Sequence, residues 1–165
     1  MNYIFKSKVE NHQEIKEKLL QQINLIPQNP YEYIFHTDWN LPKTMHREYK
    51  NLFFETVNNH LVNMCQELNV NHYEITTFWF QRYNQGGNHA IHTHPNCHYA
   101  NVYFLECPKD AGTKFKSFNI ECEEGDILSF PAFLPHMSPP IKNNEIKTVI
   151  AFNSNFDVNP FPPLS

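Results

Sequence analysis

The sequence lacks long hydrophobic runs, internal repeats and low-complexity tracts. No apolar stretch approaches the roughly 18 residues of a helical membrane span, which argues against a membrane protein. The chain also has no linker long enough to separate two bodies. Its 165 residues are therefore expected to form one domain, 1–165.

Positive charge is also in short supply. The chain has 13 Lys and Arg against 17 Asp and Glu, a net charge of −4 and no basic stripe, which argues against a nucleic-acid-binding protein. The four cysteines have no CxxC or zinc-finger spacing, and no signal peptide is recognisable. A reducing cytoplasm is therefore the expected setting.

Aromatic residues are plentiful, at 15% of the chain, and the apolar runs are short. This texture favours a jelly roll or barrel over a helix bundle. The first 72 residues differ, because a short strand within 1–5 precedes two apolar stripes at helical spacing. Asn11 and Glu14 resemble a capping box before a helix over about 12–24, and a longer helix is expected over about 44–69.

Residues 73–158 predict an antiparallel β-core. Short β-branched or aromatic segments alternate there with Gly, Pro and Asn, leaving no room for crossover helices. The expected fold is mainly β (α+β), with the N-terminal helices buttressing one sheet, and 159–165 form an extended or disordered tail. The expected strands are Glu74–Asn84, Tyr99–Glu106, Phe115–Glu121, Asp126–Pro131 and Lys147–Asn153.

Three histidines suggest a metal site. His92 and His94 follow an aromatic strand and a Gly-Gly turn, and residues two apart on a strand point to the same side. His136 follows a second strand-like segment 44 residues after His92. Imidazole is the commonest protein ligand for borderline metals. His89 and His98 are expected to line this site or to support the ligating rings.

A second histidine motif competes with this interpretation. His36-Thr37-Asp38 has the His-x-Asp pattern that supplies two ligands in many non-haem iron oxygenases. It lies before the long helix, 100 residues ahead of His136, and no Gly turn precedes it. We therefore expect it to be structural.

The C-terminal half resembles the Fe(II)- and 2-oxoglutarate-dependent oxygenases. More narrowly, it is similar to small members with a His-x-His…His pattern found in bacteria and tailed marine phages. The resemblance implies a double-stranded β-helix, a cupin-like jelly roll whose mouth holds iron, and the bacterial or host cytoplasm as the setting. The matching segments are Tyr83–Gly86, His92–Pro95, Asn101–Leu105 with Pro108, Gly125–Pro131 through His136, and Lys147–Asn153.

Residue roles follow from this resemblance. His92, His94 and His136 match the three metal ligands. Lys147 falls where the superfamily usually has an arginine that binds the distal carboxylate of 2-oxoglutarate, and Tyr83 matches a position whose hydroxyl assists. Weaker candidates for the same cosubstrate site are Gln81, Asn101, Tyr103 and Asn153.

Two positions depart from the usual pattern. His94 replaces an Asp or Glu ligand, so three neutral imidazoles leave the full charge on the metal, as in three-His zinc sites. Lys147 replaces arginine and offers a point charge without the bidentate fork. The implied cofactors are Fe(II), 2-oxoglutarate and O₂. The implied reaction is hydroxylation of a small molecule or side chain, with release of succinate and CO₂.

Two alternatives remain open from the residues. One is a cupin-type three-His metal protein that does not use 2-oxoglutarate, although His98 stands where a cupin would have glutamate. The other is a jelly-roll interaction protein without catalysis. Lys147 discriminates the first alternative, because a buried lysine near the metal favours 2-oxoglutarate and a solvent-facing one favours the cupin.

Overall fold

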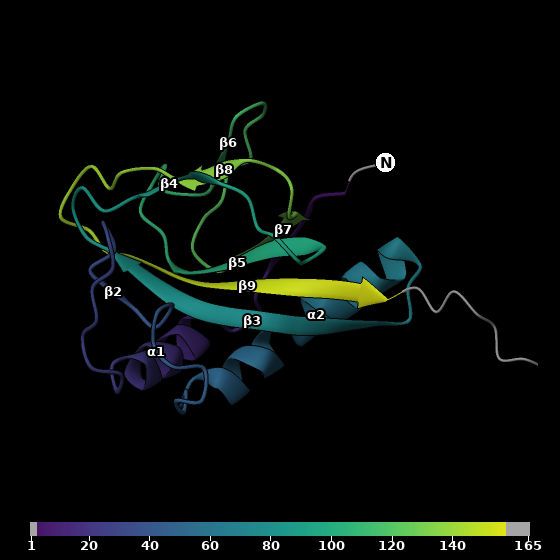
Figure 1. Ribbon diagram of the computed structural model, residues 1–165, viewed down its shortest axis with the longest axis horizontal. Helices are drawn as coiled ribbons and strands as arrows, with labels where there is room; N and C mark the ends of the chain where they lie inside the picture. The colour runs from purple at the N-terminus through teal and green to yellow at the C-terminus, as the bar shows by residue number, and fades with distance from the viewer. Residues whose placement is uncertain (1–2, 158–165) are drawn as a thin grey trace, which may run out of the picture.

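The computed structural model describes residues 3–157, so the predicted tail 159–165 lies outside the described residues. Figure 1 shows a six-stranded antiparallel sheet with both helices on one side and a three-stranded sheet on the other. The predicted mainly β fold with a helical buttress is therefore confirmed. The elements are β1 (Phe5–Lys8), α1 (His12–Ile23), β2 (His36–Thr37), α2 (Lys50–Leu68), β3 (His72–Tyr83), β4 (His89–His92), β5 (Tyr99–Glu106), β6 (Lys114–Phe115), β7 (Asp126–Pro131), β8 (His136–Ser138) and β9 (Lys147–Asp157).

The large sheet has the order β1-β7-β5-β9-β3-β2 and the small sheet the order β4-β8-β6. Both faces of the large sheet are buried. In β9, Ile150 and Phe152 pack against the helices, whereas Lys147, Val149 and Ala151 line the space between the sheets. This alternation follows from the two-residue period of a strand, and it creates a cup separate from the helix-side core.

The helices bury the apolar stripes that the sequence predicts. In α2, Phe53, Val57 and Leu61 are fully buried, and the Phe53 ring centroid lies 5.1 Å from that of Phe152. The predicted capping box is wrong. Asn11 adopts a left-handed conformation and its side chain makes no capping hydrogen bond, so α1 is held by packing instead.

The longer helix begins at Lys50 and not at 44. The preceding loop is fixed by the buried carboxylate of Asp38. One carboxylate oxygen accepts hydrogen bonds from Arg47 Nε and the Tyr49 hydroxyl, both at 2.7 Å, and the other accepts from the Phe80 amide at 2.9 Å. His36-Thr37-Asp38 is thus a structural element, as expected.

Other strand boundaries also differ from expectation. The segment predicted as Phe115–Glu121 pairs only over Lys114–Phe115, and β9 extends four residues beyond Asn153 to Asp157. The sequence also gives no sign of β2 and β8, which are two and three residues long. Strands this short are defined by pairing with a neighbouring strand and not by their own sequence pattern.

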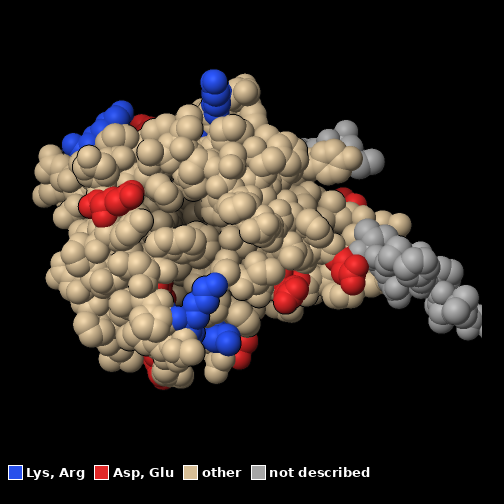
Figure 2. Space-filling view, in the orientation of Figure 1, with Lys and Arg blue, Asp and Glu red and all other residues tan. Residues whose placement is uncertain are grey.

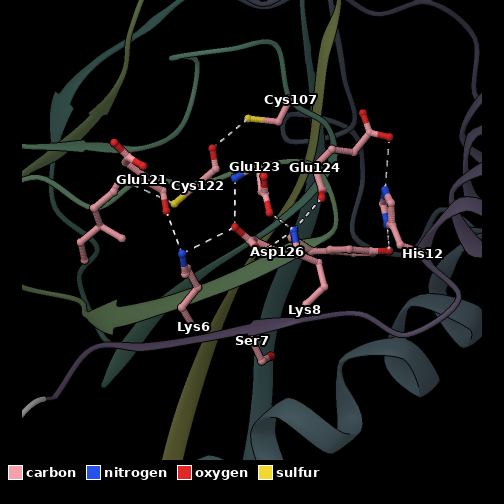
Figure 3. A network of polar contacts seen from close by, with 12 residues as sticks. Lys6, Ser7, Lys8, His12, Cys107, Glu121, Cys122, Glu123, Glu124 and Asp126 are labelled. Carbon is pink, nitrogen blue, oxygen red and sulfur yellow. Dashed lines mark hydrogen bonds and ion pairs between the residues drawn. The ribbon is translucent and has the colours of Figure 1, made fainter.

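A charged cluster ties β1 to the loop before β7 (Figure 3). The ammonium of Lys8 lies 3.0 Å from a carboxylate oxygen of Asp126 and 2.8 Å from one of Glu123. Nearby, His12 Nε2 lies 3.5 Å from the Glu124 carboxylate. Because the charge of Lys8 is matched locally, this cluster fastens an edge strand. Within residues 3–157, no helix is long and apolar enough to cross a bilayer.

Candidate metal centre

Three histidines converge between the two sheets. His92 ends β4 and His136 begins β8, directly opposite each other in the strand register, and His94 lies two residues further along. The ring centroid of His136 lies 4.3 Å from that of His92 and 5.0 Å from that of His94. Their potential ligand atoms all lie within 4.8 Å of one another. The structure thus brings together the three predicted ligands.

The hydrogen bonds of these histidines leave the same nitrogen free on each ring. Nδ1–H of His92 donates to the Ala90 carbonyl at 2.7 Å, and that of His136 donates to the Leu134 carbonyl at 2.9 Å. Nδ1–H of His94 donates to the Asn153 side-chain oxygen at 2.7 Å. In this arrangement every Nε2 carries a lone pair, which is the donor that a metal requires.

Burial keeps the three rings neutral. Desolvation lowers the pKa of His92 and of His94, and it lowers the pKa of His136 to about 3. Neutral imidazole is the form that binds metal. The site therefore needs little proton release before it accepts a divalent ion near neutral pH.

The two supporting candidates are placed differently. The His89 ring stacks on His92 with centroids 3.9 Å apart and lines the cup. Burial first, and then electrostatic interaction with His92, His94 and Lys147, lowers the pKa of His89 to about 4. His98 is exposed, and its Nδ1 accepts the Phe156 amide at 3.0 Å, so it anchors the end of β9. The predicted support of the metal site by His98 is wrong.

Lys147 is buried in the same cup. It is 2% exposed, and its Nζ donates to Ser138 Oγ at 2.9 Å. The ammonium also lies 5.4 Å from the centroid of the Tyr83 ring and 5.7 Å from that of Phe104. It forms no ion pair with any carboxylate of the described chain. Desolvation lowers its pKa to about 8, only partly offset by the nearby thiols of Cys107 and Cys122.

Tyr83 and Gln81 also face the cup. Both are buried, and the Tyr83 hydroxyl donates to Gln81 Oε1 at 2.9 Å. Burial raises the pKa of Tyr83 well above its ordinary value, so it serves as a hydrogen-bonding group and not as a base. Sequence reasoning missed two polar residues that line the same cup, Thr113 and Ser138. Ser138 follows His136 at the two-residue strand period, which is a signal that could have found it.

Two predicted cosubstrate residues point to the wrong side of the sheet. The Tyr103 hydroxyl is hydrogen-bonded to His12 Nδ1 at 2.8 Å, against α1. The Asn101 side chain joins a buried network in which its Oδ1 accepts from Ser129 Oγ and Ser129 meets His60 Nε2 on α2. Both side chains belong to the helix layer, so the prediction that they bind 2-oxoglutarate is wrong.

The mouth of the site is aromatic and mostly uncharged. A hollow of about 300 Å³ opens beside the histidines and is bordered by Trp39 and Trp79. The Trp79 ring stacks on that of His94, with centroids 6.0 Å apart. Figure 2 shows a hollow between the region of β4 and β8 and that of β3 and β9, with few charged side chains around it.

Comparisons with solved structures show which proteins share this fold. No family model and no curated protein sequence matches the chain. A 2OG-Fe(II) oxygenase family protein from Burkholderia pseudomallei superposes with a TM-score of 0.68 at 11% identity, covering 93% of this chain and 84% of that one. HygX from Streptomyces hygroscopicus, with nickel and 2-oxoglutarate bound, gives 0.65 at 10% identity, covering 99% and 85%.

A third similar structure is the viral collagen prolyl hydroxylase of Paramecium bursaria Chlorella virus-1 in its 2-oxoglutarate complex. It gives a TM-score of 0.61 at 16% identity, covering 93% of this chain and 96% of that one. These likenesses confirm the predicted resemblance at the level of the fold. The chain has the double-stranded β-helix of the 2-oxoglutarate/Fe(II) oxygenases.

Proposed function

We propose that this protein is an Fe(II)- and 2-oxoglutarate-dependent oxygenase. One observation carries the proposal. Three imidazoles with free Nε2 atoms share a cup with a buried ammonium, Lys147, that has no acidic partner within residues 3–157. A metal site alone would not require that lysine, and an isolated buried cation is costly unless a ligand neutralises it.

The residues present fit both absent groups. His92, His94 and His136 would hold the iron, because imidazole suits borderline divalent metals. Neutral ligands leave the +2 charge uncompensated, which favours a doubly anionic cosubstrate. Lys147 would bind the distal carboxylate of 2-oxoglutarate, and Ser138 and Tyr83 orient its ammonium.

Iron and 2-oxoglutarate, when bound, supply the oxidising chemistry, in which O₂ is consumed and succinate and CO₂ are released. The chain's own contribution is orientation and exclusion of water. Phe130 packs edge-on against His136 at 4.5 Å between centroids, and Val149 and Ala151 add apolar lining. In such surroundings the attraction between Lys147 and a carboxylate is stronger than in water.

The proposed substrate is a small molecule or a side chain. Among proteins of this fold, a Trichoplax adhaerens prolyl hydroxylase has been seen with a peptide fragment, and HygX with hygromycin B. The open aromatic mouth of this chain admits either kind. The cupin alternative is disfavoured because Lys147 is buried in the cup and does not face solvent.

The test is an anaerobic titration of the purified protein with Fe(II) and 2-oxoglutarate, followed by visible absorbance. We expect the weak metal-to-cosubstrate band, its loss in His92→Ala and much weaker 2-oxoglutarate binding in Lys147→Ala. Lys142→Ala, which removes an exposed lysine, is the matched control. Absence of the band in wild-type protein that binds iron would contradict the proposal.

A further inference from the structure

The strand β3 has an open edge. It pairs with β9 along nearly its whole length, but β2 covers only Gln81 and Arg82 on the other side. The next backbone group along β3, the Phe80 amide, donates a hydrogen bond to the Asp38 carboxylate. From Ile75 to Phe78, no described strand pairs with that side of β3. This stretch, Ile-Thr-Thr-Phe, carries no charge, and such edges are templates for another extended chain.

The direction of the backbone supports this use. Arg82 accepts a hydrogen bond from the Phe35 amide on the β2 side, and Phe80 accepts one there from the Thr37 hydroxyl. In an antiparallel ladder, alternate residues direct both N–H and C=O toward the same neighbour. Phe78, two residues before Phe80, therefore presents both groups at the open edge.

The open edge leads to the histidines. It borders an edge hollow of about 310 Å³, defined by Ile75–Trp79, Trp39 and Phe54. The histidine hollow of about 300 Å³, described above, shares Trp39 and Trp79 with it. The two indole rings contact each other at 4.5 Å between centroids. The two hollows therefore adjoin at the tryptophan pair, and together they are called the groove below.

Trp79, at the junction of the two hollows, has an unused hydrogen-bond donor. It is 5% exposed, and its Nε1–H finds no acceptor within residues 3–157. A buried indole N–H normally has a partner. The indole of Trp79, which borders both hollows, is therefore a point whose hydrogen bonding the free protein leaves incomplete.

The edge hollow is also locally positive. Lys43, Arg47 and Lys50 border it. Arg47 is neutralised by Asp38 at 2.7 Å, whereas Lys43 and Lys50 are exposed and make no ion pair with the described part of the chain. In a protein of net charge −4, two unmatched lysines beside an open strand favour an acidic partner.

The loop between β2 and α2, which carries Trp39, Lys43 and Arg47, is already ordered. Asp38, Arg47 and Tyr49 hold the loop through buried hydrogen bonds, so a ligand need not order it on binding. The geometry points to an extended acidic polypeptide segment as the prime substrate, paired with the open edge of β3 and passing over Trp39 to the histidines. This inference rests on the proposed function and names its substrate class. A sugar or nucleotide could contact lysine and tryptophan, but it has no regular N–H and C=O series for a strand edge.

The test uses the 165-residue protein with Mn(II) and 2-oxoglutarate. The ligands are synthetic peptides of roughly ten residues, which is long enough to pair as a strand and to continue past the tryptophans. One pool alternates Val or Thr with Glu, and a matched pool carries Lys in place of Glu. The chain contains two tryptophans, Trp39 and Trp79, and both border the groove, so intrinsic fluorescence reports its occupancy. We expect the Glu pool to bind and the Lys pool to bind at least about tenfold more weakly.

Two further arms separate charge from strand pairing. The double variant Lys43→Gln/Lys50→Gln should weaken Glu-pool binding about tenfold, whereas Lys116→Gln/Lys142→Gln, with the same change in charge at exposed sites, should not. Peptides N-methylated at alternate amides should lose about tenfold in affinity, because they cannot complete the ladder. Equal binding of both pools, or of methylated and unmethylated peptides, would overturn the inference.

Analytical sedimentation at rising protein concentration tests whether a second copy of the chain occupies the open edge instead. A dimer that excludes the peptides would refute the inference. The visible Fe(II)–2-oxoglutarate band, recorded on the same preparation, keeps the two proposals apart. A band without peptide binding removes only the substrate class. Peptide binding without a band removes the oxygenase and leaves a peptide-binding groove.

Discussion

Replacing Lys147 by methionine should stabilise the cosubstrate-free protein while greatly weakening cosubstrate binding. Burial lowers the pKa of this lysine from 10.5 to about 8, which corresponds to a cost of about 3 kcal/mol for the charged form in the folded state. Methionine fills a similar elongated space without charge. The variant also loses the hydrogen bond to Ser138, which lowers its stability by about 1 kcal/mol. The net gain in the free energy of unfolding at pH 7 is therefore expected to be about 2 kcal/mol.

The gain should depend on pH with a defined sign. The cost is fully present below pH 8, where folded and unfolded Lys147 are both protonated. Between about 8 and 10.5 the unfolded state binds more protons than the folded state, so wild-type stability rises with pH. The advantage of Lys147→Met should therefore shrink toward zero near pH 10.

Urea unfolding of the metal-free protein at pH 7 and pH 10 measures the effect on stability. Unfolding at pH 7 in the presence of Mn(II), with and without 2-oxoglutarate, measures the effect on cosubstrate binding. 2-Oxoglutarate at a hundred times its Kd for the Mn(II)-loaded protein stabilises the folded state by about 3 kcal/mol. This increment should appear in wild type and largely disappear in the variant, which keeps the three histidines and still binds Mn(II). A Lys147→Met protein that is less stable than wild type at pH 7, or a pH-independent difference, would refute the reasoning.

Three other substitutions test the site and its frame. Asn153→Ala removes the acceptor of His94 Nδ1–H and should weaken Mn(II) binding about 10- to 100-fold by calorimetry; unchanged affinity would mean that the anchor is dispensable. Asp38→Ala leaves Arg47 without its buried partner and should cost about 3–5 kcal/mol in urea unfolding, and a loss below 1 kcal/mol would contradict the assigned role. Co(II) should quench the emission of Trp79, which stacks on His94, EDTA should restore it, and Trp79→Phe should lose most of the quenching.

The convergence of the three candidate ligands was predictable because its sequence signals are local. His92 and His94 follow a Gly turn at strand spacing, and His136 follows the turn after the strand-like segment that ends at Pro131. The pairing of β4 with β8 then places two of them opposite each other. The resemblance implied a cosubstrate-binding role for Lys147 but left its burial open, and no feature of its neighbours in sequence required it to be buried.

The choice of sheet face was not predictable for Asn101 and Tyr103. Nearly every residue of β5 is buried, because helices cover one face of the large sheet and the small sheet covers the other. A strand buried on both faces shows no polar alternation. The sequence therefore carries no local sign of which alternate set enters the cup, and a shift of one residue inverts the assignment.

The start of α2 was missed for a different reason. Residues 44–49 have a helical pattern, but Asp38 and Arg47 meet only when the chain folds back on β3. That tertiary contact outweighs the local preference. Short strands such as β2 likewise depend on a distant neighbour.

The anchoring of the three candidate ligands makes one position unusually adjustable. The rings of His92 and His136 are oriented by carbonyls two residues upstream, Ala90 and Leu134, which every amino acid provides. Only the ring of His94 depends on a replaceable side chain, Asn153. An aspartate at that point would draw the Nδ1 proton more strongly and make the imidazole a more basic donor. Substitution at position 153 alone would thus change how strongly the His94 ligand donates to the metal. The orientation of the other two candidate ligands depends on no side chain.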